Sequence, residues 1–572
     1  MSFLKNISLT YIIIALGIIV YLFHFAERDP SDPYQRPIVS DAKGYYAYLP
    51  AIFIYQDLQY RFIEEMDTKY YSVGHEKHIF IQQNDRRINK TFPGIALLYM
   101  PFFLLAHFFA VVFSLEPDGY SNIYQYMFDF GQFFYATLGL IILAKSLALL
   151  NFSKRTILLA VLLLLFGTNL WFYTVYDQSV THVYNFFLVN LLVYFLLKFQ
   201  EINRPNYLIL ILGVLSLILI IRPTGILSLI LLVFICPSKA FWKKVFAQLK
   251  QLKVITLAIG VSAVLFSIPL ILWKIQSGNW IVYSYGEEGF NFSKPEIFNF
   301  LFSYAKGWWL YSPLVLVSIV FGGFFIFKSS KIGRIQTYLL VVFLVSSIYV
   351  FSSWWCWWYG FSFGQRPMVD FYFIIGFLLA VIIENLQNKR VFQVSLSLVI
   401  VPLLFLNLFQ SYQHHHGFFQ WSKPNAEIYW DNFLRFRKQA KVYVEDSWEL
   451  IYSEEGIIET ISTNVNKPFS ESVIISNLDM LNSEFAIVTF NVLATSSLSS
   501  TDLVVEYKGD QSSYRNYNFN EFCIESKTVP IQIKYDVHAS NDSLVLYFWN
   551  KDSGEKMDVD FLKVDFYLNS KD

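Results

Sequence analysis

Residues 156–199 decide the fold: they read TILLAVLLLLFGTNLWFYTV (156–175), YDQSVT (176–181) and HVYNFFLVNLLVYFLLKF (182–199). The first and last segments are nearly free of charge, and each is long enough to cross a hydrocarbon core of about 30 Å as a helix. The short middle segment is polar. The stretch therefore predicts two transmembrane helices joined by a polar turn at one membrane surface.

The same pattern recurs through the first 420 residues. Of the 572 residues, 55% are hydrophobic and 15% are charged, whereas a soluble domain carries about 25% charged residues. No small-residue cleavage site follows the first apolar segment, 9–25, so we interpret it as an uncleaved helix. We predict a polytopic α-helical membrane protein with roughly 11 to 13 transmembrane helices. Its formal net charge of zero gives no general attraction to nucleic acid.

Lysine and arginine indicate the orientation, because they favour cytoplasmic loops. Basic loops follow residues 150, 237, 327 and 388, and they alternate with loops rich in aromatic residues. With the basic loops inside, the other side receives the large loop 26–90, the loops 176–181, 275–307 and 354–368, and everything after about 412. One stretch conflicts with this scheme. Residues 92–150 must cross an odd number of times but contain two apolar segments, so either 92–115 is a re-entrant or half-inserted helix or an end is misplaced.

After residue 421, apolar and polar residues alternate, as in EFAIVTFNVLA (484–494) and VPIQIKYDV (529–537). A period of two is typical of half-buried strands. We therefore predict a transmembrane domain over 1–420, a linker over 421–470, and a β-sandwich domain over 471–572 on the non-cytoplasmic side.

Two carboxylates stand at the predicted outer surface. Asp41 precedes an aromatic run, 45–55, that we expect to lie along the membrane surface. Asp177 lies in the turn before His182. Ionisable residues at membrane boundaries are costly and often functional. The plainer alternatives are a solvated loop acid or a helix cap for Asp41, a turn acid for Asp177, and a hydrogen-bonded or snorkelling side chain for His182.

Cationic side chains are expected at the same surface. Lys306 lies in SYAKGWW, Arg366 in GFSFGQRP and Arg222 in IRPTG. Lysine suits phosphate as a point charge, and arginine as a planar fork. The alternatives are an interface anchor for Lys306 and an Arg366–Asp370 ion pair within one loop.

Aromatic residues crowd the loop WWCWWYG (354–360). The rings of Trp357 and Tyr359 are candidates for stacking on a sugar or holding a prenyl tail. Three cysteines and the adjacent histidines 414–416 fit no metal-ligand pattern. We expect no metal site, and no cofactor apart from a donor substrate.

Taken in order, these motifs resemble the GT-C superfamily of membrane glycosyltransferases, and within it the bacterial proteins related to protein O-mannosyltransferase and aminoarabinose transferase. The likeness covers about residues 8–420. It is carried by SDAKGYYAYLPA, FPGIALLYMPFFLLAH, FGTNLWFYTVYDQSVTHVY, IRPTG, SYAKGWWLYSPL and WWYGFSFGQRP. The resemblance implies a multi-pass protein of the bacterial inner membrane that moves a sugar from a polyprenyl-phosphate donor to an acceptor outside the cytoplasm.

By this resemblance, the family's first-loop acid falls on Asp41 and its second acid on Asp177. Its phosphate-binding basic residues fall on Lys306 and Arg366. Members that act on proteins often carry an Asp-Glu pair in the first loop, whereas this chain has Ser40-Asp41-Ala42. The acceptor therefore stays open between a glycan, a lipid and a protein.

A mechanism follows as a hypothesis. Asp41 acts as the general base, Lys306 and Arg366 stabilise the departing lipid phosphate, and Asp177 orients the sugar or acceptor with His182. Attack opposite the leaving group predicts inversion. The competing interpretation is a lipid-linked glycan transporter or a polysaccharide export component, although transporters more often place ionisable residues near the bilayer midplane. A surface scaffold would need only one or two spans.

Overall fold

The computed structural model describes residues 8–27, 36–71, 79–83, 86–286, 288–387, 389–419 and 424–436. In the C-terminal region it describes the strand residues 448–456, 461–463, 473–476, 485–494, 501–509, 513–518, 528–536, 541–550 and 557–569. The chain divides into two compact units. One holds residues 1–416 with 421–424, and the other holds 417–420 with 425–572.

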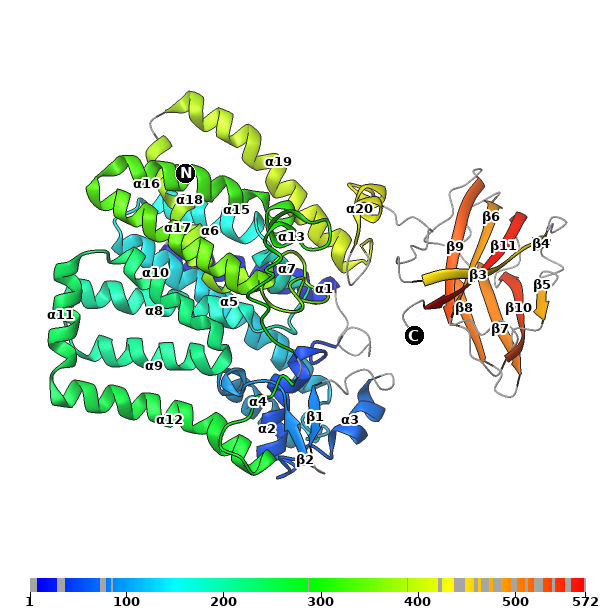
Figure 1. The fold of residues 1–572 in the computed structure, drawn as a ribbon, viewed down its shortest axis with the longest axis horizontal. Coiled ribbons are helices and arrows are strands. Elements are labelled where there is room, and N and C mark those ends of the chain that lie inside the picture. Colours follow the sequence, from blue (N-terminus) through cyan, green and yellow to red (C-terminus); the bar gives the residue numbers. More distant parts are fainter. Residues whose placement is uncertain are drawn as a thin grey trace. The chain divides into compact units, whose positions relative to one another are not determined.

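Within the described residues of the first unit, seven helices are long and apolar enough to cross a membrane. Shorter apolar helices accompany them (Figure 1). The chain is therefore a multi-pass membrane protein, while the predicted number of crossings stays a prediction. The long helices are α1 (Leu9–Glu27), α4 (Gly94–Val112), α5 (Asn122–Leu149), α8 (His182–Ile202), α12 (Leu252–Ser277), α17 (Lys331–Ser352) and α19 (Arg390–His415).

Burial separates the core of this unit from its periphery. In the 18-residue apolar stretch of each helix, 67% of the residues of α5 and 78% of those of α8 are buried, whereas only 17% in α12 and 11% in α19 are. The exposed side chains of α12 and α19 are mostly apolar, as lipid contact requires. The helices α5 and α8 therefore form the core around which the other helices pack.

Several helices are interrupted. The segment 154–175 breaks into α6 (Lys154–Phe166) and α7 (Leu170–Val175), and α9 (Asn206–Ile221) ends at Arg222, before Pro223 opens the 3₁₀-helix η3 (Pro223–Leu227). Proline supplies no backbone N–H, so a helix breaks there. Irregular backbone at membrane depth is tolerated only against protein or a watery space. The remaining short elements are α10 (Ser228–Ile235), α15 (Pro313–Val317), η4 (Ser318–Gly322), α16 (Gly323–Ser329) and α18 (Phe373–Leu386).

The first long loop contains α2 (Asp41–Phe53), α3 (Ile63–Tyr70) and a hairpin of β1 (Phe80–Gln83) with β2 (Arg86–Asn89). The aromatic run 45–55 forms most of α2, and its position along the membrane surface stays a prediction. Residues 42–51 are all buried, including three tyrosines. Neighbouring loops and α4 cover the helix, so its aromatic rings serve as packing residues.

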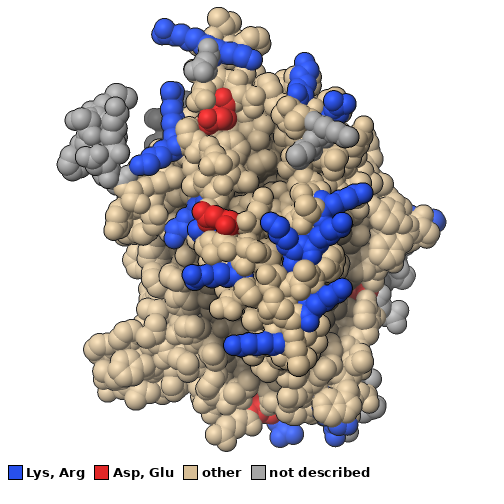
Figure 2. Space-filling view, turned by 90° about the vertical axis from the view of Figure 1, so that its left-hand side faces the viewer, with Lys and Arg blue, Asp and Glu red and all other residues tan. Residues whose placement is uncertain are grey.

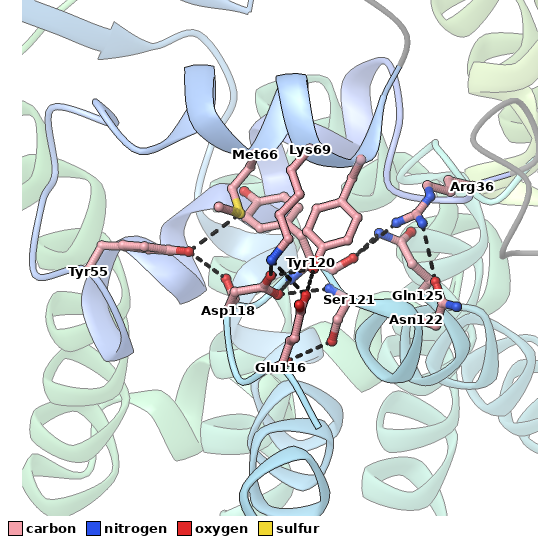
Figure 3. A network of polar contacts seen from close by, with 11 residues as sticks. Arg36, Tyr55, Met66, Lys69, Glu116, Asp118, Tyr120, Ser121, Asn122 and Gln125 are labelled. Atoms are coloured by element: carbon pink, nitrogen blue, oxygen red, sulfur yellow. Dashed lines mark hydrogen bonds and ion pairs between the residues drawn. The ribbon is translucent and has the colours of Figure 1, made fainter. Parts of the chain in front are cut away.

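Both ends of α4 are tied to this loop. Before α4, the Thr91 carbonyl accepts a hydrogen bond from the Tyr48 hydroxyl at 2.6 Å, and after α4 the Gly119 carbonyl accepts one from Tyr46 at 2.5 Å. Asp118 joins the same loop to α3 through Lys69 (Figure 3). These contacts tie both flanks of α4 to the first long loop. The re-entrant or half-inserted path of 92–115 stays a prediction, since α4 is long and apolar enough to cross a membrane.

The helix α8 joins two opposite faces. Near its end, the ring of Phe199 lies 5.8 Å from that of Phe241 in α11 (Lys239–Leu249), and at its start His182 contacts Arg222. Its 21 residues span about 30 Å. Figure 2 shows the α11 side of the molecule, over which lysines and arginines are spread. We call it the basic face and the opposite side the outer side.

The second unit contains α20 (Ala426–Asn432) and two antiparallel sheets, with strand orders β5-β10-β7-β8 and β3-β11-β6-β9, while β4 pairs with β11. The alternating runs thus form strands, and the packing of the two sheets into a sandwich stays a prediction. Strands begin at residue 448, inside the expected linker 421–470, because β3 and β4 both pair with β11. The bounds are β3 (Trp448–Gly456), β4 (Ile461–Thr463), β5 (Val473–Ser476), β6 (Phe485–Ala494), β7 (Thr501–Gly509), β8 (Ser513–Asn518), β9 (Thr528–Asp536), β10 (Asn541–Asn550) and β11 (Met557–Asn569).

Candidate active site

An ion pair joins two of the predicted site residues, 325 positions apart in sequence. The Arg366 Nη2 donates to Asp41 Oδ2 at 3.0 Å. Asp41 opens α2, and Arg366 opens the 3₁₀-helix η5 (Arg366–Phe371). The side chains are 36% and 18% exposed, so a dissolved molecule can reach the pair. The guanidinium also lies over the ring of Tyr359, 5.9 Å from its centroid.

The alternative Arg366–Asp370 pair is wrong. In an α-helix, residues four apart share one face, but a 3₁₀-helix has three residues per turn, so positions four apart point about 120° away from each other. Arg366 therefore turns to Asp41, and Asp370 turns to α8. The helix-cap alternative for Asp41 also fails, because no side chain caps α2.

Asp370 belongs to a buried relay. It accepts a hydrogen bond from His182 Nδ1 at 2.6 Å and another from Asn185 Nδ2 at 2.8 Å. The other ring nitrogen of His182, Nε2, lies 2.9 Å from Nη1 of Arg222. His182 and Asp370 are only 1% and 2% exposed. The snorkelling alternative for His182 is therefore wrong and the hydrogen-bonded alternative is confirmed, since the residue links Arg222 to Asp370.

Lys306 lies in the turn between α13 (Ile297–Phe302) and α14 (Trp308–Tyr311). Its side chain is 1% exposed, and Nζ lies 3.3 Å from His414 Nε2. Burial, helped by the positive charge of Arg366, lowers the pKa of Lys306 from 10.5 to about 7. An interface anchor would keep its ammonium group in water, so the structure does not support that alternative.

Asp177 makes a turn and also acts on Arg366. Its Oδ1 accepts from the backbone and hydroxyl of Ser179 at 3.0 and 2.6 Å, as the turn-acid alternative predicts. Although burial opposes it, the negative charges of Asp41 and Asp177 raise the pKa of Arg366 well above its usual range. Both carboxylates therefore act on one guanidinium. The hydrogen-bond partner of His182 is Asp370 and not Asp177.

The end of α7, which leads into Asp177, is held from two helices. Gln132 of α5 donates to the carbonyls of Tyr173 and Asp177 at 2.6 and 3.4 Å. His24 of α1 donates from Nδ1 to the Val175 carbonyl at 2.6 Å, and its Nε2 lies 3.3 Å from Asp129. These contacts fix where the turn of Asp177 lies.

Sequence reasoning missed three residues beside the ion pair. Burial and the nearby Asp41 carboxylate raise the pKa of Tyr45 well above 10.0, and the charges of Arg222 and Asp41 also act on Tyr285. Gln365 is completely buried, and neither of its amide atoms has a partner in the described part of the chain. The run of tyrosines in α2 was the only available signal, and it was read as a membrane-surface feature.

Trp357 is a predicted site residue whose position gives no support to a role in binding. It is 9% exposed, and its ring packs edge-on against Trp358 at 5.9 Å. Among the described residues no group of three metal-ligating side chains is found. We use the name outer cluster for a set of polar residues at this end of the helices that are linked by contacts or by electrostatic interactions: Asp41, Tyr45, His182, Arg222, Tyr285, Tyr359, Arg366 and Asp370.

The geometry thus defines a multi-pass membrane protein with a partly exposed cluster of carboxylates and guanidinium groups at the outer ends of its helices. No protein-family model matches the chain, and no curated protein does. One similar solved structure is that of arabinosyltransferase EmbB from Mycobacterium smegmatis, with a TM-score of 0.36 and 9% identity. That alignment covers 100% of this chain and 66% of EmbB, so the chain spans less than two thirds of that protein's length. At this TM-score and identity the likeness says nothing about activity.

Proposed function

We propose that this chain is a membrane glycosyltransferase of the GT-C type, which moves a sugar from a polyprenyl-phosphate donor to a glycan, lipid or protein acceptor at the outer side of a bacterial inner membrane. The observation that carries the proposal is the ion pair of Asp41 and Arg366. A carboxylate that can accept a proton and a guanidinium that can bind phosphate meet there, at a partly exposed place where the apolar helices end. The motif order in the sequence supports the same family.

The chemistry needs a proton acceptor for the acceptor hydroxyl and a positive environment for the departing phosphate. Asp41 supplies the first, and general-base help contributes about 10²–10⁴-fold in rate. Arg222, Arg366 and Lys306 supply the second, since preorganised charge stabilises the transition state most strongly in a site with little water. Asp177 orients the sugar or acceptor. Attack on the face of the anomeric carbon opposite the leaving phosphate gives inversion.

The donor's lipid tail requires an apolar path beside the cluster. The exposed side chains of the peripheral helices are largely hydrocarbon, and each buried CH₂ of a prenyl chain contributes about 0.8 kcal/mol. The donor itself is the one small molecule that the proposal requires.

The test uses full-length protein in liposomes. A polyprenyl-phosphate monosaccharide, radiolabelled in the sugar, is supplied with a membrane extract as the source of acceptor. Label is expected to leave the lipid and enter an acceptor with wild-type protein, and to stay on the lipid with Asp41→Asn. Labelled nucleotide sugars are expected not to react. Label that crosses the bilayer while still attached to its lipid would instead establish the transporter.

A further inference from the structure

The two arginines of the outer cluster have different kinds of partner. Arg366 donates to the charged carboxylate of Asp41 at 3.0 Å. Arg222 donates to a ring nitrogen of His182 at 2.9 Å, and among the described residues no carboxylate lies within ion-pair distance of it. One guanidinium charge is therefore balanced by direct contact and the other is not.

The contacts fix the protonation of His182. A guanidinium group only donates hydrogen bonds, so Nε2 of His182 must accept. The ring proton therefore sits on Nδ1, which donates to Asp370 at 2.6 Å. Asn185 donates to the second oxygen of the same carboxylate. A neutral His182 holds Arg222 by one hydrogen bond without neutralising its charge, and the buried Asp370 holds the ring in that tautomer.

An arriving anion meets these two arginines differently. Binding at Arg366 requires breaking an existing ion pair, whereas binding at Arg222 breaks none. Arg222 also keeps its remaining N–H groups for a new acceptor, since His182 uses Nη1. A phosphate oxygen is an acceptor that matches a guanidinium fork.

We propose that Arg222, positioned by His182 and Asp370, is the resting site for the donor's lipid phosphate, and that Arg366 joins it only by leaving Asp41. This inference rests on the proposed function and assigns its two arginines separate roles. His182 and Asp370 are positioning residues, because they act on the phosphate through Arg222.

Because Arg366 exchanges Asp41 for the phosphate, Asp41 can act as a base only after the donor has bound. While Arg366 holds Asp41, the carboxylate oxygen that it contacts is occupied. Once Arg366 moves to the phosphate, that oxygen accepts the hydrogen of the acceptor hydroxyl. The acceptor oxygen then bonds to the anomeric carbon, and the bond from that carbon to the phosphate oxygen breaks with its electron pair. The proton passes to Asp41, and the lipid phosphate leaves with its added negative charge against Arg222 and Arg366.

The first experiment measures binding of farnesyl phosphate to full-length protein in detergent, with farnesol as the uncharged control. Loss of a charge-assisted contact in Arg222→Ala is expected to weaken binding about 10-fold or more. Arg366→Ala is expected to change it less than about 3-fold, because its ion pair with Asp41 is lost together with its phosphate contact. Arg87→Ala is the matched control, since Arg87 sits in the same outer region and pairs with Glu64.

The second experiment tests the positioning residues by steady-state transfer. His182→Ala is expected to raise KM for the donor about 3- to 10-fold with kcat little changed, and His182→Gln to restore part of the loss, because its amide oxygen can accept from Arg222. Asp370→Ala is expected to raise KM for the donor in the same way, and Asp370→Asn to restore part of that loss, since Asn185 can turn its amide over: its Oδ1 has no partner in the described structure. A purely structural role would lower kcat and thermal stability together in both alanine variants.

The outcomes separate this inference from the function. A wild-type protein that binds farnesyl phosphate no better than farnesol would overturn both. Binding that survives Arg222→Ala, or that falls equally in Arg222→Ala and Arg366→Ala, would overturn the inference alone. Inorganic phosphate is the last arm: if it binds as tightly as farnesyl phosphate, the site recognises free phosphate and not a lipid headgroup, which contradicts the proposal.

Discussion

The basic face and the outer cluster both carry positive side chains, but in opposite settings. On the basic face, lysines and arginines are spread over the surface in water (Figure 2). Arg366 of the outer cluster is 18% exposed, and Lys306 on the same side of the molecule is 1% exposed. Burying a cation is costly unless it has a partner, and the described structure supplies a carboxylate, a histidine or an aromatic ring for each. Lysine and arginine therefore indicate the orientation of the protein in the membrane at the basic face, whereas at the other face they contribute to the proposed active site.

The difference teaches how to interpret charge in such a chain. Solvated cations at helix ends can be exchanged for other polar residues with little effect on stability. Buried cations fixed by named partners cannot, because removing one partner leaves the other uncompensated. The comparison is therefore tested best by making the same kind of substitution at both faces and comparing the losses of activity.

Asp41→Asn carries the largest expected effect. It keeps the shape of the side chain but removes the base, so sugar transfer should fall about 10²–10⁴-fold. Radiolabelled transfer, normalised to folded protein, measures it. Asp57→Asn is the matched control in the same outer loop, because Asp57 caps its own turn through the backbone N–H groups of residues 59 and 61. Equal activity of the two variants would remove Asp41 from the mechanism.

Because of Lys306, the apparent affinity for the donor should decrease at alkaline pH, which gives the pH profile of donor affinity an alkaline limb. Its pKa of about 7 means that the ammonium is present below pH 7 and is lost as the pH rises through 7. The donor is a phosphodiester that does not titrate there, while Arg366 stays charged and His414 is the other titratable contact. Apparent donor affinity should fall up to about 10-fold between pH 6 and 8.5. Lys306→Arg should abolish the limb, since its guanidinium stays protonated; an unchanged limb would contradict this role.

Gln365 is expected to lower the stability of the protein while contributing to its activity. A buried amide without partners costs about 1–3 kcal/mol, so Gln365→Met should raise the thermal unfolding temperature. If the amide is kept for a substrate hydroxyl, the same variant should lower kcat/KM about 10-fold. Thermal unfolding and transfer are measured on one preparation. A lower unfolding temperature would show that Gln365 has partners in the protein.

Gln132 tests whether Asp177 must be held in place. Gln132→Leu keeps the volume but removes the two hydrogen bonds to the end of α7. Transfer should fall about 3- to 10-fold, which corresponds to about 1 kcal/mol. Glu384→Gln is the control, because Glu384 joins α18 to the start of α6 at the other end of the helices. An equal loss in both variants would mean that only general stability was affected.

The basic face should show the smallest effect. Lys243→Gln with Lys244→Gln removes two exposed charges from α11, and such surface changes stay within about 0.5 kcal/mol. Transfer and farnesyl phosphate binding should change less than about 2-fold. A loss of binding comparable with that of Arg222→Ala would indicate that the donor binds at the basic face, which would contradict the account.

The sequence alone predicts those features that depend on a periodic pattern or on a biased distribution of residue types. Hydropathy predicted the long helices, alternation predicted strands such as β6 and β9, and the placement of lysine and arginine brought Asp41, Arg222 and Arg366 to one side. Each of these signals is local and summed over many residues, so single exceptions do not alter it.

Pairing could not be predicted in this way. The spacing of Arg366 and Asp370 suggests an ion pair, and only the 3₁₀ geometry of η5 turns them apart. The contact of Asp41 with Arg366 depends on tertiary packing over 325 residues. Likewise α4 is as apolar as a spanning helix, and the contacts of its two flanking residues Thr91 and Gly119 with α2 depend on tertiary packing.

The most direct test of the account is to locate the donor phosphate. A polyprenyl phosphate with a diazirine beside the phosphate is photolysed with full-length protein, and the labelled peptides are identified by mass spectrometry. The account predicts adducts in α2 and in residues 354–372, which decrease when unlabelled farnesyl phosphate competes. Competable adducts in α11 and the basic loops, with none in α2 or 354–372, would contradict it.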